Sequence, residues 1–243
     1  MKKYILSLLI VMTINARVQA QGCVAIRTVG GLNTMEHSMM NGMHEMMHDS
    51  SAKKMEAPKW DFNISGRYFK SYKHFNGTDE VTQRVADGTD VRNFSRTVDL
   101  SLVRKLNEKW SIGIDLPLVY NERTSLYEHV SSVKGSPRFS TFSQGIGDIR
   151  ISAYKWLIAP KAGNKGNLLG GLGIKLPTGN YKATDVFHTS LTATRVGPVD
   201  QSIQPGDGGL GFTLELNGFR AINNTWSLYS NAYYLINPQG IME

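Results

Sequence analysis

Residues 110–118 read WSIGIDLPL and show a strict alternation of side-chain character. Trp110, Ile112 and Ile114 are apolar, and the residues between them are small or polar. A period of two residues is typical of a β-strand with one apolar and one polar face. The same alternation predicts further strands at 60–72, 97–106, 149–153, 168–176 and 210–217. Residues 226–237 are expected to form a seventh strand of mixed character. The predicted fold class is therefore all-β.

The connections between these strands alternate in length. Short connections at 107–109, 159–166 and 220–225 are interleaved with long ones at 73–91, 120–146 and 177–209. Short periplasmic turns opposite long outer loops are typical of outer-membrane barrels. Strand alternation by itself fits a soluble lipocalin-like barrel or sandwich equally well. The connection lengths therefore favour an antiparallel up-and-down transmembrane β-barrel.

Tryptophans lie near the short connections. Trp110 and Trp226 follow short turns, and Trp156 precedes one. Trp60 opens the first strand from the same side. Because aromatic rings favour the membrane–water interface, these positions predict an outward aromatic belt. Trp156 is an exception, since it shares its parity with the charged residues of its own strand.

The polar parity of the predicted strands carries charges of both signs. A soluble barrel would expose this parity to water and bury the apolar one. In a membrane barrel the polar parity lines a wet lumen and the apolar parity faces lipid. We therefore expect a lumen lining whose charges nearly cancel, formed by Arg67, Asp99, Asp115, Asp148, Arg150, Lys175 and Glu215.

The N-terminus has the pattern of a Sec-type signal peptide over residues 1–20. Two lysines precede the apolar run 4–12, and Val18-Gln19-Ala20 supplies small residues for a cleavage site. The run is too short for a membrane helix. Removing the signal takes the formal charge of +7 to 24 positive against 20 negative residues, without a basic stripe, so nucleic-acid binding is disfavoured. The single cysteine excludes a disulfide scaffold.

Residues 21–58 are expected to form a flexible periplasmic leader that is rich in methionine and histidine. The stretch 35–55 holds seven of the ten methionines and three of the six histidines. Thioether and imidazole groups suit Cu(I) or Ag(I) better than zinc or calcium, although such a tract is also compatible with a low-complexity segment of no specific role. The candidate ligands are Met35, His37, Met39, Met40, Met43, His44, Met46, Met47 and His48.

Two segments carry a family resemblance. Gly145-Ile146-Gly147-Asp148-Ile149-Arg150 resembles the G-x-G-D-[LI] strand start of the MetA-pathway of phenol degradation family of outer-membrane proteins. Residues 173–181, GIKLPTGNY, resemble that family's strand that ends in L-P-T-G-[DN]-[YF]. The resemblance spans residues 60–237 and implies an outer-membrane barrel that passes small, often hydrophobic, compounds, with no catalytic residues to carry over. The glycines themselves predict tight turns where strands leave the barrel rim.

The strand number and the C-terminal residues depart from this pattern. Single-chain bacterial barrels have even numbers of strands, and such a barrel should end in an aromatic residue, whereas this sequence ends in Ile241-Met242-Glu243. Open strand edges are costly in lipid. We therefore expect the barrel over residues 59–243 to be incomplete at its C-terminal end, or to pair with another chain.

The predicted function is passage or uptake of small solutes across the outer membrane, with membrane lipid and the barrel-assembly machinery as partners. No G-x-S-x-G or H-E-x-x-H motif accompanies the loop histidines His74, His129 and His188, so we expect no enzyme activity. Two alternatives remain open. One is an envelope protein that handles copper or silver through the leader, and the other is a soluble periplasmic all-β binding module.

Overall fold

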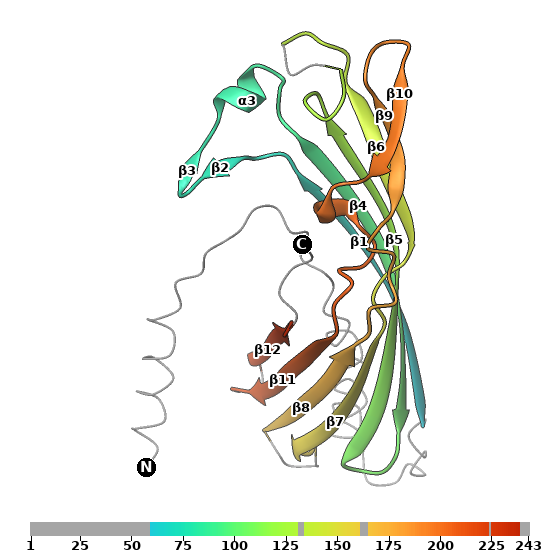
Figure 1. Cartoon of the computed structure of the whole chain (residues 1–243). Coiled ribbons are helices and arrows are strands. Elements are labelled where there is room, and N and C mark those ends of the chain that lie inside the picture. Colours follow the sequence, from blue (N-terminus) through green and yellow to red (C-terminus); the bar gives the residue numbers. More distant parts are fainter. Residues whose placement is uncertain (1–58, 131–133, 161–164, 224, 239–243) are drawn as a thin grey trace.

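The computed structural model describes residues 59–130, 134–160, 165–223 and 225–238. The fold is all-β, with 60% of the described residues in strands and 4% in helices. One antiparallel sheet of seven successive strand positions curls into half a barrel (Figure 1). The prediction of an antiparallel barrel-type fold is confirmed. The signal peptide and the methionine- and histidine-rich leader lie outside the described residues.

The sheet has simple up-and-down topology. Each strand pairs antiparallel with the next, in the order β1 (Trp60–Ser71), β4 (Arg92–Lys105), β5 (Trp110–Ser125), β7 (Arg150–Ile158), β8 (Gly166–Lys175), β11 (Gly211–Ala221) and β12 (Ser227–Ile236). Among the described residues, β1 and β12 form the two edges of this sheet.

An eighth segment, β6 (Phe139–Ile146), pairs with one half of β5, while β7 pairs with the other half. The ladder is interrupted opposite Pro117, which lies in the middle of β5 and has no N–H to donate. Three residues, 147–149, here oppose only two on β5. Therefore β6 and β7 are one long strand with a bulge at the proline.

The connections differ in length as predicted. Short connections join β4 to β5, β7 to β8 and β11 to β12, and these strand ends lie at the lower end of Figure 1. The long connections at the other end carry small elements, namely β2 (Phe75–Asn76), β3 (Asp79–Glu80), α3 (Gln83–Ala86), β9 (Thr184–His188), β10 (Thr194–Pro198) and the 3-10 helix η1 (Gln201–Ile203). No helix in the described ranges is long and apolar enough to cross a membrane.

Several predicted strand ends are wrong at the long-loop end. β4 begins at Arg92 rather than at residue 97, and the predicted connection 120–146 shrinks to 126–138 because β5 continues to Ser125 and β6 begins at Phe139. The backbone ladder continues there although every residue of β5 after Tyr120 is polar. Loss of apolar alternation therefore marked a change of surroundings and not the end of a strand.

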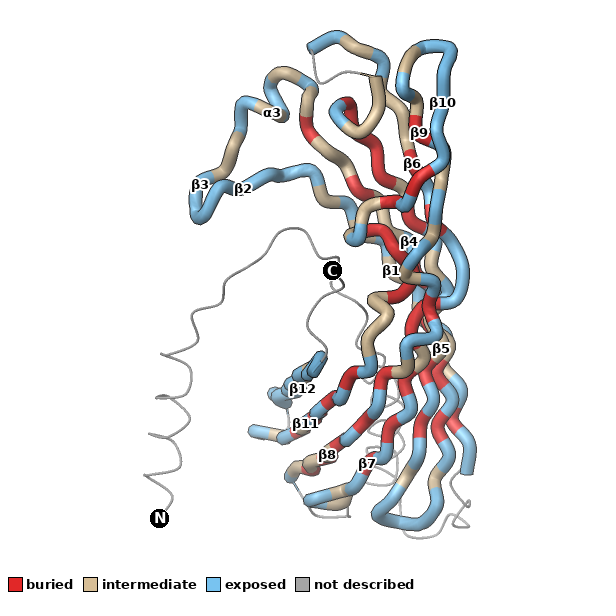
Figure 2. The backbone as a smooth tube through the Cα atoms, viewed as in Figure 1, coloured by how far each residue is buried: buried red, intermediate tan, exposed pale blue. Residues whose placement is uncertain are grey.

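Buried and exposed residues alternate along the strands of the sheet (Figure 2). The distribution of polar and apolar side chains between these positions is the reverse of that in a water-soluble barrel. Along β4, the charged Asp99 is 4% exposed, whereas its neighbour Val98 is 41% exposed. On β1, Phe62 and Ile64 are 62% and 61% exposed. Polar side chains thus fill the protected face of the sheet, and apolar side chains cover the open face.

Candidate functional site: the polar concave face

The buried polar face lies on the inside of the curl. Gly171 of β8 has Tyr154 of β7 and Glu215 of β11 as its register partners. A Cβ atom added at Gly171 would meet the Tyr154 ring at 2.8 Å and the Glu215 Cβ at 3.1 Å. Side chains from the two flanking strands therefore converge above β8, which happens only on the inside of a curved sheet. We call this surface the concave face and the opposite, apolar surface the convex face.

An apolar cluster lies on the concave face at the short-turn end. Tyr154, Leu169 and Phe219 are buried together, and Trp156 and Ala221 pack against them. The register between β7 and β8 shifts between Trp156 and Ile158. This packing explains why Trp156 departs from the predicted aromatic belt, because its ring belongs to the interior cluster rather than to the convex face.

A central charge cluster lies next to the apolar cluster. The Arg150 guanidinium donates to Asp115 Oδ2 from Nε at 3.0 Å and from Nη2 at 2.6 Å, and it also pairs with Glu215. Ser101 Oγ donates to the other oxygen of Asp115, Oδ1, at 2.5 Å. The Tyr233 ring centroid lies 5.6 Å from the guanidinium carbon. One arginine thus joins carboxylates from β5 and β11 across the intervening β8.

A second cluster surrounds Lys175. Its Nζ lies 3.5 Å from Asp148 Oδ2 and also pairs with Asp207. Asp148 accepts hydrogen bonds from two backbone N–H groups, that of Gly179 at 3.0 Å and that of Asp207 at 3.1 Å. Asp148 therefore binds the backbone of two loop segments, at Gly179 and Asp207, and also pairs with the ammonium group of Lys175.

The two motifs of the family resemblance meet at this cluster. The Ile149 N–H donates to Thr178 Oγ1 at 2.8 Å, and the Thr178 hydroxyl donates to the Gly147 carbonyl at 2.9 Å. Gly179 packs directly against Gly206, where a Cβ would have no room. The expectation that the motif glycines form rim turns is wrong for Gly147, which lies in the bulge opposite Pro117, and its N–H donates to the Pro117 carbonyl at 2.8 Å.

A third cluster lies toward the long loops. Arg123 pairs with Glu128 at 2.9 Å and with Asp200 at 3.2 Å. The segment that carries Asp200 continues into η1, where the Asn121 side chain donates to the Ile203 carbonyl at 2.9 Å. Ile203 is 1% exposed. The connection between β10 and β11 therefore folds inward and lies against the concave face, as the position of η1 beside β4 and β5 indicates (Figure 1).

The three clusters share one composition: each holds one buried cation between two carboxylates. The formal net charge of each cluster is therefore −1. Two further pairs on the concave face are balanced: Arg67 lies in the field of Asp99, and Lys105 lies 3.7 Å from Asp61. The sum over these groups is negative, which can attract a cation and repel an anion.

The residues predicted to line a lumen all lie on the concave face or in the bulge beside it. Asp99, Asp115, Arg150, Lys175 and Glu215 are buried, and Arg67 is half-buried. Asp148 is the one that lies outside a strand. Sequence reasoning missed five partners of these clusters, namely Arg123, Glu128, Asp200, Asp207 and Tyr233. The usable signal was for Arg123 alone, which continues the parity of Asp115 although every residue from 121 to 125 is polar.

The long loops bring two of the three loop histidines together. The ring centroids of His129 and His188 are 5.8 Å apart, and the Phe139 ring stacks on His188 at 3.8 Å. His129 Nδ1 accepts a hydrogen bond of 3.1 Å from the His188 backbone N–H. Burial lowers the pKa of His129. In the described part of the chain, no three histidine, cysteine or acidic side chains are grouped so that they could hold a metal ion, and the predicted methionine and histidine ligands lie outside that part.

Comparison with protein-family models finds none that matches the chain, and comparison with curated proteins finds no match either. The resemblance to the MetA-pathway of phenol degradation family therefore rests on the two motifs and stays a prediction.

Proposed function

We propose that the protein is an outer-membrane β-barrel protein whose concave face lines a passage for small solutes. The supporting observation is the reversed side-chain distribution, with buried charges inside the curl and large apolar side chains exposed on the convex face. Lipid removes the cost of exposing such a surface, whereas water does not. A soluble all-β binding module would need a partner over the whole convex face.

The convex face also has aromatic residues at two levels. At the short-turn end, Trp60 lies under Arg104 at 5.1 Å, and Trp110 lies under Lys155 at 5.0 Å. At the long-loop end, Tyr68 and Tyr120 occupy equivalent positions on β1 and β5. Rings beside cations are typical of the interfaces of a bilayer.

The spacing of the two levels fits a bilayer. Nine residues run from Trp60 to Tyr68, and eleven run from Trp110 to Tyr120. A tilted strand that crosses a membrane needs about 9–11 residues. The residues between the levels on the convex face are apolar, which supports a transmembrane position for this part of the sheet.

The clusters of one cation and two carboxylates favour cationic or neutral solutes over anions. Fixed carboxylates near a narrow aqueous path raise the local concentration of cations. The segment that carries Asp200 and Asp207 lies inside the curl, so these carboxylates would face a solute on its way through.

Reconstitution of the full chain in lipid vesicles tests the proposal. We expect the protein to float with the vesicles. In a gradient of potassium chloride, the reversal potential should have the sign expected for a channel that prefers cations. Glu215→Gln should reduce that preference, and the matched control Glu122→Gln should leave it unchanged, because Glu122 lies at the loop end and pairs with Ser140. Recovery of the protein from the periplasmic fraction of cells would contradict a barrel.

Handling of copper or silver is a second candidate function, which the methionine- and histidine-rich leader favours. Deletion of residues 33–56 should then increase the copper sensitivity of a strain that depends on this protein. A deletion strain with unchanged sensitivity, and a leader peptide with no better than millimolar affinity for Cu(I), would remove this candidate.

A further inference from the structure

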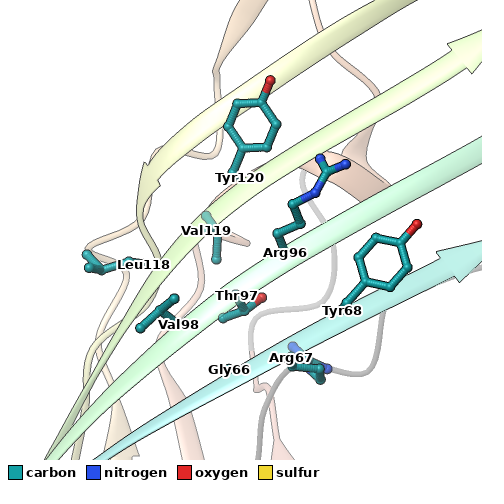
Figure 3. A pocket seen from close by; sticks show the side chains of 9 residues that line it. All are labelled: Gly66, Arg67, Tyr68, Arg96, Thr97, Val98, Leu118, Val119 and Tyr120. Carbon is teal, nitrogen blue, oxygen red and sulfur yellow. The ribbon is translucent and has the colours of Figure 1, made fainter.

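A groove runs across the convex face of β1, β4 and β5 at the long-loop end (Figure 3). Its volume is about 540 Å³. Gly66, Val98 and Leu118 are register partners on the three strands and form its apolar part. Nothing lies within 4 Å of the point where a Cβ of Gly66 would be, so this glycine opens the groove on β1.

Arg96 lies at the head of the groove, between two tyrosines. Its guanidinium carbon is 5.7 Å from the Tyr68 ring centroid and 5.5 Å from that of Tyr120, and both are its register partners. Figure 3 shows the three side chains rising from neighbouring strands on the same side of the groove. The two rings hold the guanidinium in place, which reduces the entropy lost when it binds an anion.

The charge of Arg96 is not compensated within the described part of the chain, where no carboxylate forms an ion pair with it. Lys70 lies on the same face of β1 as Tyr68, two residues closer to the long loops. Its Nζ lies 5.3 Å from the centroid of the Tyr72 ring. It has no ion-pair partner in that part either. Two positive charges therefore stand at the polar end of an apolar groove.

We infer that this groove binds an anionic lipid that carries a phosphate group, with an acyl chain along Gly66, Val98 and Leu118 and the phosphate on Arg96. The inference rests on the proposed membrane position of the sheet. An apolar trough beside an uncompensated guanidinium matches a molecule that joins a hydrocarbon chain to a phosphate. The guanidinium can donate two parallel hydrogen bonds to phosphate oxygens, and Lys70 supplies the second charge that favours an anionic over a zwitterionic headgroup.

Lipid titration of the purified full chain in neutral detergent tests this inference. Phosphatidylglycerol should raise the temperature of unfolding, phosphatidylcholine should raise it less, and inorganic phosphate should have no effect. Arg96→Gln and Gly66→Leu should each weaken the phosphatidylglycerol effect, with about tenfold lower affinity. Arg104→Gln is the matched control, because Arg104 also lies over an aromatic ring on the convex face but does not line the groove.

The outcomes separate this inference from the proposed function. Equal stabilisation by the two phospholipids, or an Arg96→Gln variant that responds like the unmodified protein, overturns the lipid site while vesicle flotation still supports a membrane barrel. Stabilisation by inorganic phosphate alone identifies a free-anion site and also overturns it. Failure of the protein to float with vesicles refutes the membrane position and the lipid site together.

Discussion

Replacing Ile64 by arginine tests on which side of the sheet the lipid lies. Ile64 is on the convex face, four residues from Trp60 and four from Tyr68, and is 61% exposed. At about 3.4 Å per residue and a tilt of about 40°, it lies about 10 Å from either interface. An arginine at such a depth costs about 2–4 kcal/mol of folding free energy in a bilayer.

The same substitution in a water-soluble protein would have little effect. Exposed positions without special contacts usually change the free energy of unfolding by less than about 0.5 kcal/mol. Phe75→Arg is the matched control, because Phe75 is 52% exposed but lies in β2, within a long loop. The membrane assignment therefore predicts a difference of about 2–4 kcal/mol between substitutions of two side chains that are both more than half exposed.

Urea unfolding of the two variants in phospholipid vesicles, followed by tryptophan fluorescence, measures this difference. Trp60 and Trp110 are exposed on the sheet, and Trp226 is exposed immediately before β12, so the three report transfer of the sheet from lipid to water. If Ile64→Arg and Phe75→Arg unfold with free energies within about 0.5 kcal/mol of each other, the convex face does not face lipid and the reasoning is wrong.

Three further predictions concern the concave face and the loops. Arg150→Met leaves two buried carboxylates without their cation and should cost about 3–5 kcal/mol in the same unfolding assay; a loss below about 1 kcal/mol would mean that water reaches the cluster freely. Gly173→Val places a side chain against hydroxyls of β7 and β11 and should cost about 1–3 kcal/mol, unlike Gly66→Val, which meets open space. Burial lowers the folded pKa of His129, so the opened loop binds more protons. The contribution of His129 to the stability of the closed loop is therefore complete above about pH 6.5, and it is lost as the pH falls through the folded pKa of His129. Exchange of the His188 amide hydrogen, corrected for its intrinsic rate, should speed up on acidification, and an identical pH response in His129→Phe would contradict this cause.

The parity of the strands was predictable because it is a local property. Successive side chains of a strand point to opposite faces whatever the strand pairs with, so Arg67, Asp99 and Glu215 could be assigned to one face before their neighbours were known. Parity also placed Trp156 on this face, but it could not give the reason. The Trp156 ring packs against a cluster that includes Leu169 and Phe219, which come from two other strands.

The charge clusters were not predictable from periodicity. Arg150 and Glu215 are 65 residues apart, and they meet because the glycines of β8 leave space above that strand. Asp200 and Asp207 belong to a connection that reads as a loop, and only its inward course brings them to Arg123 and Lys175. No local pattern encodes that course, because it results from backbone contacts such as that between Gly179 and Gly206.

The sequence by itself determined the all-β class, the order of the strands, and which residues share a face, because a two-residue period follows from the geometry of each strand alone. The tertiary structure decided where the strands end, which carboxylates surround each cation, and where Arg96 stands between its tyrosines. These features depend on register, curvature and the packing of distant segments. They are set by contacts between residues far apart in the chain, which the alternation within a strand does not record.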